Sequence, residues 1–180
     1  TYCTDIRERL LTDGVTTSFQ PLYSPDGKKV AYLQNREAVC IMDLKSGKTK
    51  VAMDAKYNYS YSDGDQYFTW SPDSKWLLAD YMGNGGWNNV DVALVDAEGK
   101  EEPVNLTQSG YTDSHARWVM GGKAMIFASD RAGYRSHGSW GSHRDVYITF
   151  FDAGAYSKFR MNKEDRALLE EAEKADKKQE

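Results

Sequence analysis

The chain has 180 residues, of which 13% are aromatic, with 12 Tyr and 5 Trp, and this composition favours a β-rich fold. Its 23 basic and 27 acidic residues give a net charge of −4, which argues against a nucleic acid as partner. No apolar run reaches the roughly 20 residues that a membrane-spanning helix needs, so a membrane is not an expected partner either.

A repeat is the strongest feature of the sequence. Three segments align, and they cover residues 22–32, 69–79 and 117–127. Their aromatic anchors, Tyr23, Trp70 and Trp118, follow one another at steps of 47 and 48 residues. In the first two segments the anchor precedes Ser-Pro-Asp, which favours a tight turn, and an apolar strand follows. A period of this length in strand-rich sequence is typical of β-propeller blades.

Residues 1–13 are expected to form the outermost strand of a preceding blade. A Leu-Thr pair precedes the first anchor by 12 positions, and another Leu-Thr pair precedes the third anchor by the same 12. These pairs are Leu11-Thr12 and Leu106-Thr107. The second pair ends a predicted fourth strand, so the first is assigned the same role in a blade that lacks its other strands.

Three blades follow, and they are predicted over residues 19–53, 67–107 and 115–160. Each begins with a strand that ends at the anchor, continues through the turn into a second strand, and reaches a third strand after a variable loop. The third strands are expected over residues 38–42, 90–95 and 145–150. The expected fold class is all-β, a partial β-propeller of about three four-stranded antiparallel blades with one extra outer strand and a short C-terminal helix.

The third repeat and the tail depart from this pattern. Gly121-Gly122 stands where the other repeats have Pro-Asp or Asp-Gly, which predicts a looser turn. Residues 161–180 are charged and rich in helix formers, and Asn162 is a suitable N-cap. We expect a charged helical tail or a linker there.

Three blades are too few to close a ring, since propellers have about 4 to 8. Open blade faces and edges are normally covered in proteins. The expected partner at these edges is therefore the rest of a larger propeller, or further copies of this chain.

No catalytic residue, metal site or cofactor is predicted. Ser139 and His143 lie in a glycine-rich loop that lacks the rigidity of a catalytic triad. His115, His137 and His143 lack metal-ligand spacing, and a solvated loop is the simpler interpretation. Cys3 and Cys40 have the alternatives of a disulfide or two free thiols, and the sequence favours the free thiols.

Ligand binding is predicted on one face of the blades. The short turns after first and third strands, which carry Lys45 and Lys100, lie on the opposite face. The long loops after second strands and between blades are rich in aromatic residues, Asn, Gly and Ser, a mixture typical of recognition surfaces. The predicted binding residues are Tyr59, Tyr61, Trp87, Asn88, Tyr111, Arg131, Tyr134, His137 and Trp140.

These motifs resemble a known family of repeats. Trp70-Ser71-Pro72-Asp73, the Leu-Thr pairs and Phe127-Ala128-Ser129-Asp130-Arg131 resemble TolB-like β-propeller repeats. Ser129-Asp130-Arg131 with its long loop, and the segment 155–160, are similar more narrowly to the propeller part of tricorn-type serine peptidases.

The resemblance implies a non-catalytic propeller segment that binds or gates extended peptides, with the catalytic serine in a protease domain that this sequence does not contain. An alternative is a TolB-like scaffold that binds a protein partner in the periplasm. A third is carbohydrate binding, in which Trp87 and Trp140 stack on sugar rings. A periplasmic or other extracytoplasmic location is expected, and a cytoplasmic one stays open.

Overall fold

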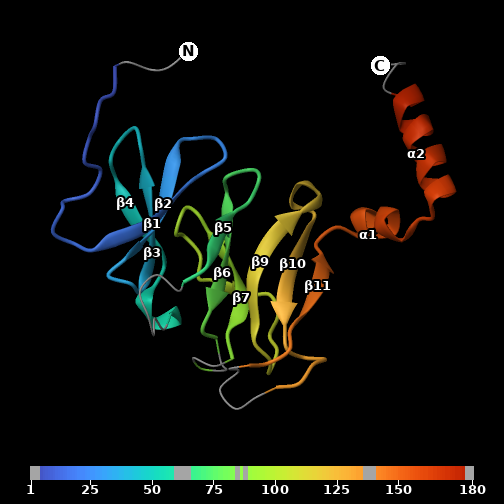
Figure 1. Cartoon of the computed structure of the whole chain (residues 1–180). Helices are drawn as coiled ribbons and strands as arrows, with labels where there is room; N and C mark the ends of the chain where they lie inside the picture. The colour runs from blue at the N-terminus through green and yellow to red at the C-terminus, as the bar shows by residue number, and fades with distance from the viewer. Residues whose placement is uncertain (1–4, 59–65, 84–85, 87–88, 136–140, 177–180) are drawn as a thin grey trace.

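The computed structural model describes residues 5–58, 66–83, 86, 89–135 and 141–176, and it contains three antiparallel sheets side by side in a fan (Figure 1). Each sheet is one blade. Blade 1 has the strand order β1-β2-β3-β4, with bounds β1 Ser18–Tyr23, β2 Lys29–Gln34, β3 Ala38–Asp43 and β4 Thr49–Met53. The predicted fold class, a partial β-propeller with a short C-terminal helix, is confirmed, with differences at the two ends of the chain.

Blade 2 repeats the topology of blade 1. A short 3₁₀ helix, η1 (Ala55–Tyr57), follows blade 1. The strands of blade 2 are β5 Phe68–Trp70, β6 Trp76–Tyr81, β7 Asp91–Asp96 and β8 Val104–Asn105, in the order β5-β6-β7-β8.

Blade 3 has three strands, whereas four were predicted. They are β9 Asp113–Val119, β10 Ala124–Ser129 and β11 Asp145–Phe150, with the 3₁₀ turn η2 (Met120–Gly122) after β9. Helices α1 (Ala153–Arg160) and α2 (Lys163–Asp176) follow β11 in place of a fourth strand. The Asp152 carboxylate accepts the Ala155 amide at 2.6 Å and caps α1, so the chain turns into a helix directly after β11. Helix therefore begins at residue 153, before the predicted tail.

The N-terminal segment also differs from its prediction. In the described part, residues 5–13 form no strand. A single strand has no hydrogen-bonding partners of its own, and the blade to which it was assigned has no other strand in this chain. Instead, Leu11 and Thr12 lie beside β1, β2 and β3, where they share a small cavity with Tyr32 and Met42.

The Ser-Pro-Asp motif forms the same turn in blades 1 and 2. The Ser24 hydroxyl donates to the Asp26 carboxylate (2.6 Å) and accepts the Lys29 amide (2.9 Å). In blade 2 the Ser71 hydroxyl donates to Asp73 (2.6 Å) and accepts the amide of the residue five positions on (3.0 Å). In blade 3, η2 takes the place of this turn and has no side-chain cap at its start.

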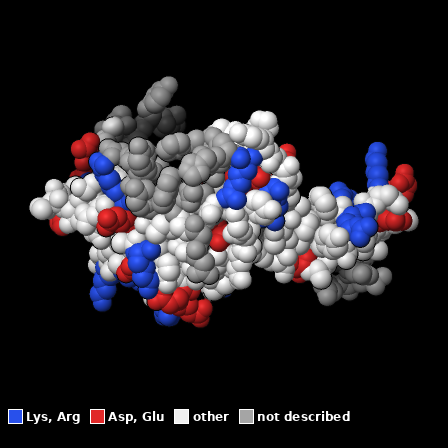
Figure 2. Space-filling view, turned by 90° about the horizontal axis from the view of Figure 1, so that it is seen from below, with Lys and Arg blue, Asp and Glu red and all other residues white. Residues whose placement is uncertain are grey.

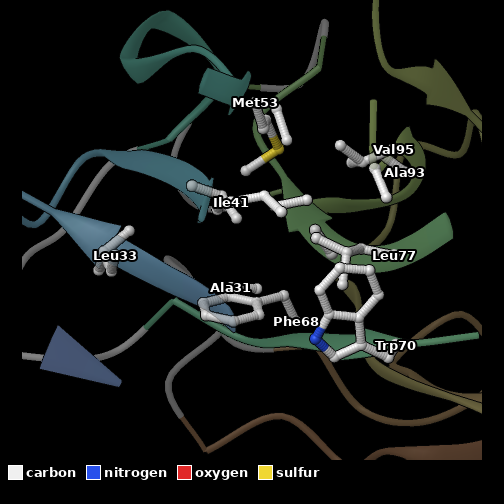
Figure 3. Packing of buried hydrophobic residues seen from close by; sticks show 13 residues of the cluster. Ala31, Leu33, Ile41, Met53, Phe68, Trp70, Leu77, Ala93 and Val95 are labelled. Atoms are coloured by element: carbon white, nitrogen blue, oxygen red, sulfur yellow. The ribbon is translucent and has the colours of Figure 1, made fainter. Parts of the chain in front are cut away.

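Adjacent blades pack face to face through apolar side chains. The core between blades 1 and 2 is shown in Figure 3, and its residues include Ala31, Leu33, Ile41, Met53, Phe68, Trp70, Leu77, Ala93 and Val95. A second cluster joins blades 2 and 3, with Leu78, Val92, Ala116, Met125 and Phe127. Anchor tryptophans add a polar link, because Trp70 Nε1 donates to the Leu22 carbonyl (3.0 Å) and Trp118 Nε1 to the Thr69 carbonyl (3.4 Å).

The first prediction concerns the turn. Asp73→Ala removes the acceptor of the Ser71 hydroxyl and of the Lys75 amide, so it should lower the free energy of unfolding by about 0.5–2 kcal/mol. Urea unfolding measures this, with Lys45→Ala in an exposed turn as control. A variant that lost ligand binding at unchanged stability would contradict the structural role of the motif.

Candidate functional site

Antiparallel topology places the turns on one side of the blades and the long loops on the other. We call these sides the turn face and the loop face. Figure 2 views the loop face, on which Lys, Arg, Asp and Glu side chains lie in small groups of mixed sign. No single-sign field covers the described part of this face, so its recognition chemistry has to come from specific groups.

A polar network crosses all three blades near the loop face. Gln20 in β1 donates through Nε2 to the Gln66 carbonyl (3.1 Å), and Gln66 donates through Nε2 to the Asp80 carbonyl. The Asp80 carboxylate then accepts the amide of His115 in β9 (2.8 Å). The chain of contacts thus runs from β1 through the segment before β5 and the end of β6 to β9, and it ties the three blades together at their loop-face ends.

The network continues into the loop before β11. The Ser114 hydroxyl lies 3.1 Å from His115 Nδ1 and accepts from the Arg144 guanidinium at 3.0 Å. We call this set the inner-strand network, and its members are Gln20, Gln66, Asp80, Ser114, His115 and Arg144.

The repeat explains why two of these residues project where they do. Gln20 and His115 each stand three positions before an anchor, and both have a positive φ, 56° and 57°. Each lies at a register shift in its strand pair, a bulge that turns one residue out of the ladder. Tyr67 holds the corresponding place in blade 2, and its ring lies 4.9 Å from the His115 ring. Equivalent positions of the three blades therefore carry an amide, a phenol and an imidazole.

Asp80 is the most unusual member of the network. The equivalent positions in the other blades hold Leu33 and Ala128, so a carboxylate replaces an apolar residue. Its side chain is 12% exposed, and burial raises the pKa of the Asp80 carboxyl to about 7, although the His115 amide and the Arg144 charge act to lower it. A buried acid that titrates near neutrality is a signature of functional sites.

His115 is affected by the same surroundings. Its side chain is 60% exposed, and its Nδ1 lies 3.9 Å from Asp80 Oδ2. Partial burial lowers the pKa of the His115 imidazole, and the positive charges of Arg144 and Arg117 lower it further. At neutral pH the ring is therefore mostly uncharged and presents a hydrogen-bonding edge.

Ser114, His115 and Asp80 have the residue types of a catalytic triad without its geometry. In a triad the serine and the acid contact opposite nitrogens of the imidazole. Here both lie closest to Nδ1, and Ser114 is buried. This trio cannot pass a proton from the hydroxyl through the ring to the acid.

Two arginines lie beside the network, one bonded within blade 3 and the other bonded to the loops of blade 2. The Arg131 guanidinium donates to the buried Asp113 (2.7 Å) and to Ser129 (2.9 Å) and lies over the Phe127 and Tyr147 rings. Arg131 thus joins the start of β9 to the end of β10, where Asp113 and Ser129 are paired, and its predicted ligand role stays a prediction.

The second arginine reaches the preceding loop. Arg135 donates to the Gly110 carbonyl (2.8 Å) and to Asn89, pairs with Asp130 (3.5 Å), and lies 5.5 Å from the centre of the Tyr111 ring. The loops after β8 and β10 therefore form one surface.

Two predicted binding residues are exposed on this surface. Tyr111 is 40% exposed, and Tyr134, next to Arg135 in sequence, is 65% exposed with its ring edge against His143. Arg131 was described above, and the remaining six lie outside the described residues: Tyr59, Tyr61, Trp87, Asn88, His137 and Trp140.

Sequence reasoning missed most of the inner-strand network. The available signal was a break in the repeat, because Asp80 stands in an apolar strand where the other repeats have Leu or Ala. The bulges at Gln20 and His115 had no sequence signal, since neither residue type favours a positive φ as glycine does.

No three His, Cys, Asp or Glu side chains in the described ranges gather as metal ligands. Cys40 is a buried free thiol, and burial raises its pKa to about 11, while Cys3 lies outside the description. Neither helix in the described part is long and apolar enough to span a bilayer.

Comparison with known proteins identifies the fold. No family model matches the chain. A TolB-like protein from Agrobacterium tumefaciens is similar with a TM-score of 0.57 and 20% identity, over 79% of this chain and 48% of that one. The chain has a β-propeller fold.

Two peptidase structures support the same conclusion. The β-propeller domain of the Trilobed protease from Pyrococcus furiosus matches with a TM-score of 0.51 and 23% identity, over 75% of this chain and 41% of that one. A prolyl endopeptidase matches with a TM-score of 0.50 and 18% identity, over 77% of this chain and 21% of that one. The chain thus spans less than half the length of each of these proteins.

The second prediction tests Asp80. The pKa of its carboxyl is about 7 in the folded protein and near 3.8 when unfolded, so the folded state binds the proton more tightly. The free energy of unfolding therefore falls as the pH rises from about 4 to 7. Asp80→Asn removes this loss, and at about pH 8 the variant should be more stable by about 2–4 kcal/mol.

Urea unfolding across this pH range gives the measurement. His115 acts in the opposite sense, because its lowered pKa makes stability fall as the pH drops below its unfolded value of 6.5. His115→Gln therefore serves as control and should retain the loss between about pH 4 and 7. Parallel pH profiles for Asp80→Asn and the unmodified chain would contradict the assignment.

Proposed function

We propose that this chain is a non-catalytic β-propeller segment of a peptidase and that it binds an extended peptide on its loop face. The observation that carries the proposal is the inner-strand network, in which the largely buried acid Asp80 lies among polar groups from three blades. The structural likeness to the propellers of two peptidases supports the parent class.

The chemistry of the site suits a peptide backbone. An extended peptide presents alternating amide donors and carbonyl acceptors. The network offers acceptors at Asp80 and His115 and a donor at Arg144, while Tyr67 and Tyr111 provide apolar faces with polar tips. Such mixed sites fix orientation through a few polar groups and gain affinity from aromatic contact.

A TolB-like scaffold that binds a folded protein partner in the periplasm is the second candidate. The similarity to the Agrobacterium protein favours it, because that match covers 48% of the other chain, a larger share than either peptidase match covers. The same loop face would then meet a protein surface, and Tyr111 and Tyr134 would be its exposed anchors.

The third prediction tests peptide binding directly. A mixture of fluorescently labelled, unstructured peptides is titrated with the chain and followed by anisotropy. Tyr111→Ala and His115→Ala should each raise the dissociation constant about 5- to 150-fold, which corresponds to a hot-spot loss of about 1–3 kcal/mol. The peptides should remain uncut, as mass spectrometry of the same samples will show.

Lys45→Ala, on the turn face, is the matched control and should leave binding unchanged. Cleavage of the peptides by the purified chain would refute the non-catalytic role. If no peptide binds, but the chain binds a folded protein partner and Tyr111→Ala weakens that binding, the scaffold function is supported in place of peptide binding.

A further inference from the structure

Blade 3 ends in an open strand. In blades 1 and 2 the third strand pairs on both sides, whereas among the described residues β11 pairs only with β10. Its residue Val146 is 75% exposed. Such an edge presents unpaired backbone groups, which proteins normally cover or block.

Blade 2 shows how a fourth strand is held in this fold. The Asp91 carboxylate accepts from the Asn105 amide group (2.7 Å), the Thr107 hydroxyl (2.9 Å) and the Ser109 amide (3.0 Å). The same hydroxyl of Thr107 also accepts the Val92 amide at 3.1 Å.

An apolar contact accompanies this polar clamp. Leu106 donates its amide to the Val92 carbonyl (2.8 Å), and its side chain packs with the cluster that contains Val92 and Leu78. The Asp91 carboxylate therefore binds Thr107, and the apolar surface formed by Val92 and Leu78 packs against Leu106.

Blade 3 repeats the receiving half of this clamp. Ala79 pairs with Ala93 in blade 2, and Phe127 pairs with Tyr147 at the equivalent position of blade 3. This register makes Asp145 the counterpart of Asp91, Val146 that of Val92, and Ile126 that of Leu78. Ile126 and Ile148 line an open groove of about 530 Å³, and side chains of α1 and α2 form its other wall.

The inserting half of the clamp occurs at the other end of the chain. Leu11-Thr12 has the same spacing to its anchor, 12 residues, as the Leu106-Thr107 pair. Within one chain the two halves cannot meet, because residues 5–17 lie beside blade 1 and β11 lies at the far end of the fan (Figure 1).

We propose that residues 9–13 of a second copy pair with β11 as the fourth strand of blade 3. The Thr12 hydroxyl then donates to Asp145 and accepts the Val146 amide, and Leu11 packs on Val146 and Ile126. The contact is head to tail, and such contacts form closed rings when the rotation between copies allows it.

Sedimentation of the full chain over a range of concentrations tests this proposal. Self-association is expected, and Thr12→Ala and Asp145→Ala should each weaken it about 10- to 100-fold, the effect of losing a hydrogen bond to a charged group. Thr107→Ala is the matched control: it removes the same hydroxyl inside the chain, so it should lower the melting temperature and leave association unchanged.

A mixing experiment guards against variants that merely misfold. A chain without residues 1–13 keeps the β11 edge, and Asp145→Ala keeps the inserting segment. At a concentration where the unmodified chain associates, each alone should associate far more weakly, and a mixture should form a one-to-one complex.

A full chain that is monomeric at every concentration would overturn the proposal. So would association that both variants retain, or capture at β11 of an unrelated extended peptide without self-association.

Discussion

The rest of the structure depends on the face-to-face packing of neighbouring sheets. A four-stranded sheet of this size has two faces to cover, and here each inner face is covered by the next blade. Leu33 and Ile41 of blade 1 meet Leu77 of blade 2 in one core, and the Trp70 indole is bonded to the Leu22 carbonyl across the same boundary. The order of the blades follows from this packing, and in the described residues the outer faces of blades 1 and 3 are not covered by another blade.

Departures from the repeat mark the residues with roles beyond packing. Asp80 occupies a position that is apolar in both other blades, and its raised pKa means that ionisation costs the folded state free energy. Proteins keep such costly groups mainly where function needs them. Asp145 and Leu11-Thr12 follow the repeat instead, since they correspond to Asp91 and to Leu106-Thr107, which contact each other within blade 2.

The sequence predicted the elements whose cause is local. The anchors, the Ser-Pro-Asp turns and the apolar alternation of the second strands depend on nearby residues, so the repeat revealed the blades. The missing fourth strand of blade 3 was not predicted, because capping of α1 by Asp152 competes with strand formation there. The inner-strand network was missed for a similar reason, since the burial of Asp80 arises only when blades 2 and 3 meet.

The most direct test of the account is native-state hydrogen exchange of the strand amides, read residue by residue. If the core between the blades holds them together, the amides of Leu33 and Ile41 in blade 1 and of Leu77 and Val95 in blade 2 should exchange through one common opening. The free energy of this opening should equal that of global unfolding. In the Trp70→Phe variant it should fall by the same amount for the amides of both blades. Exchange of blade 1 through a separate, easier opening that Trp70→Phe does not alter would contradict the account.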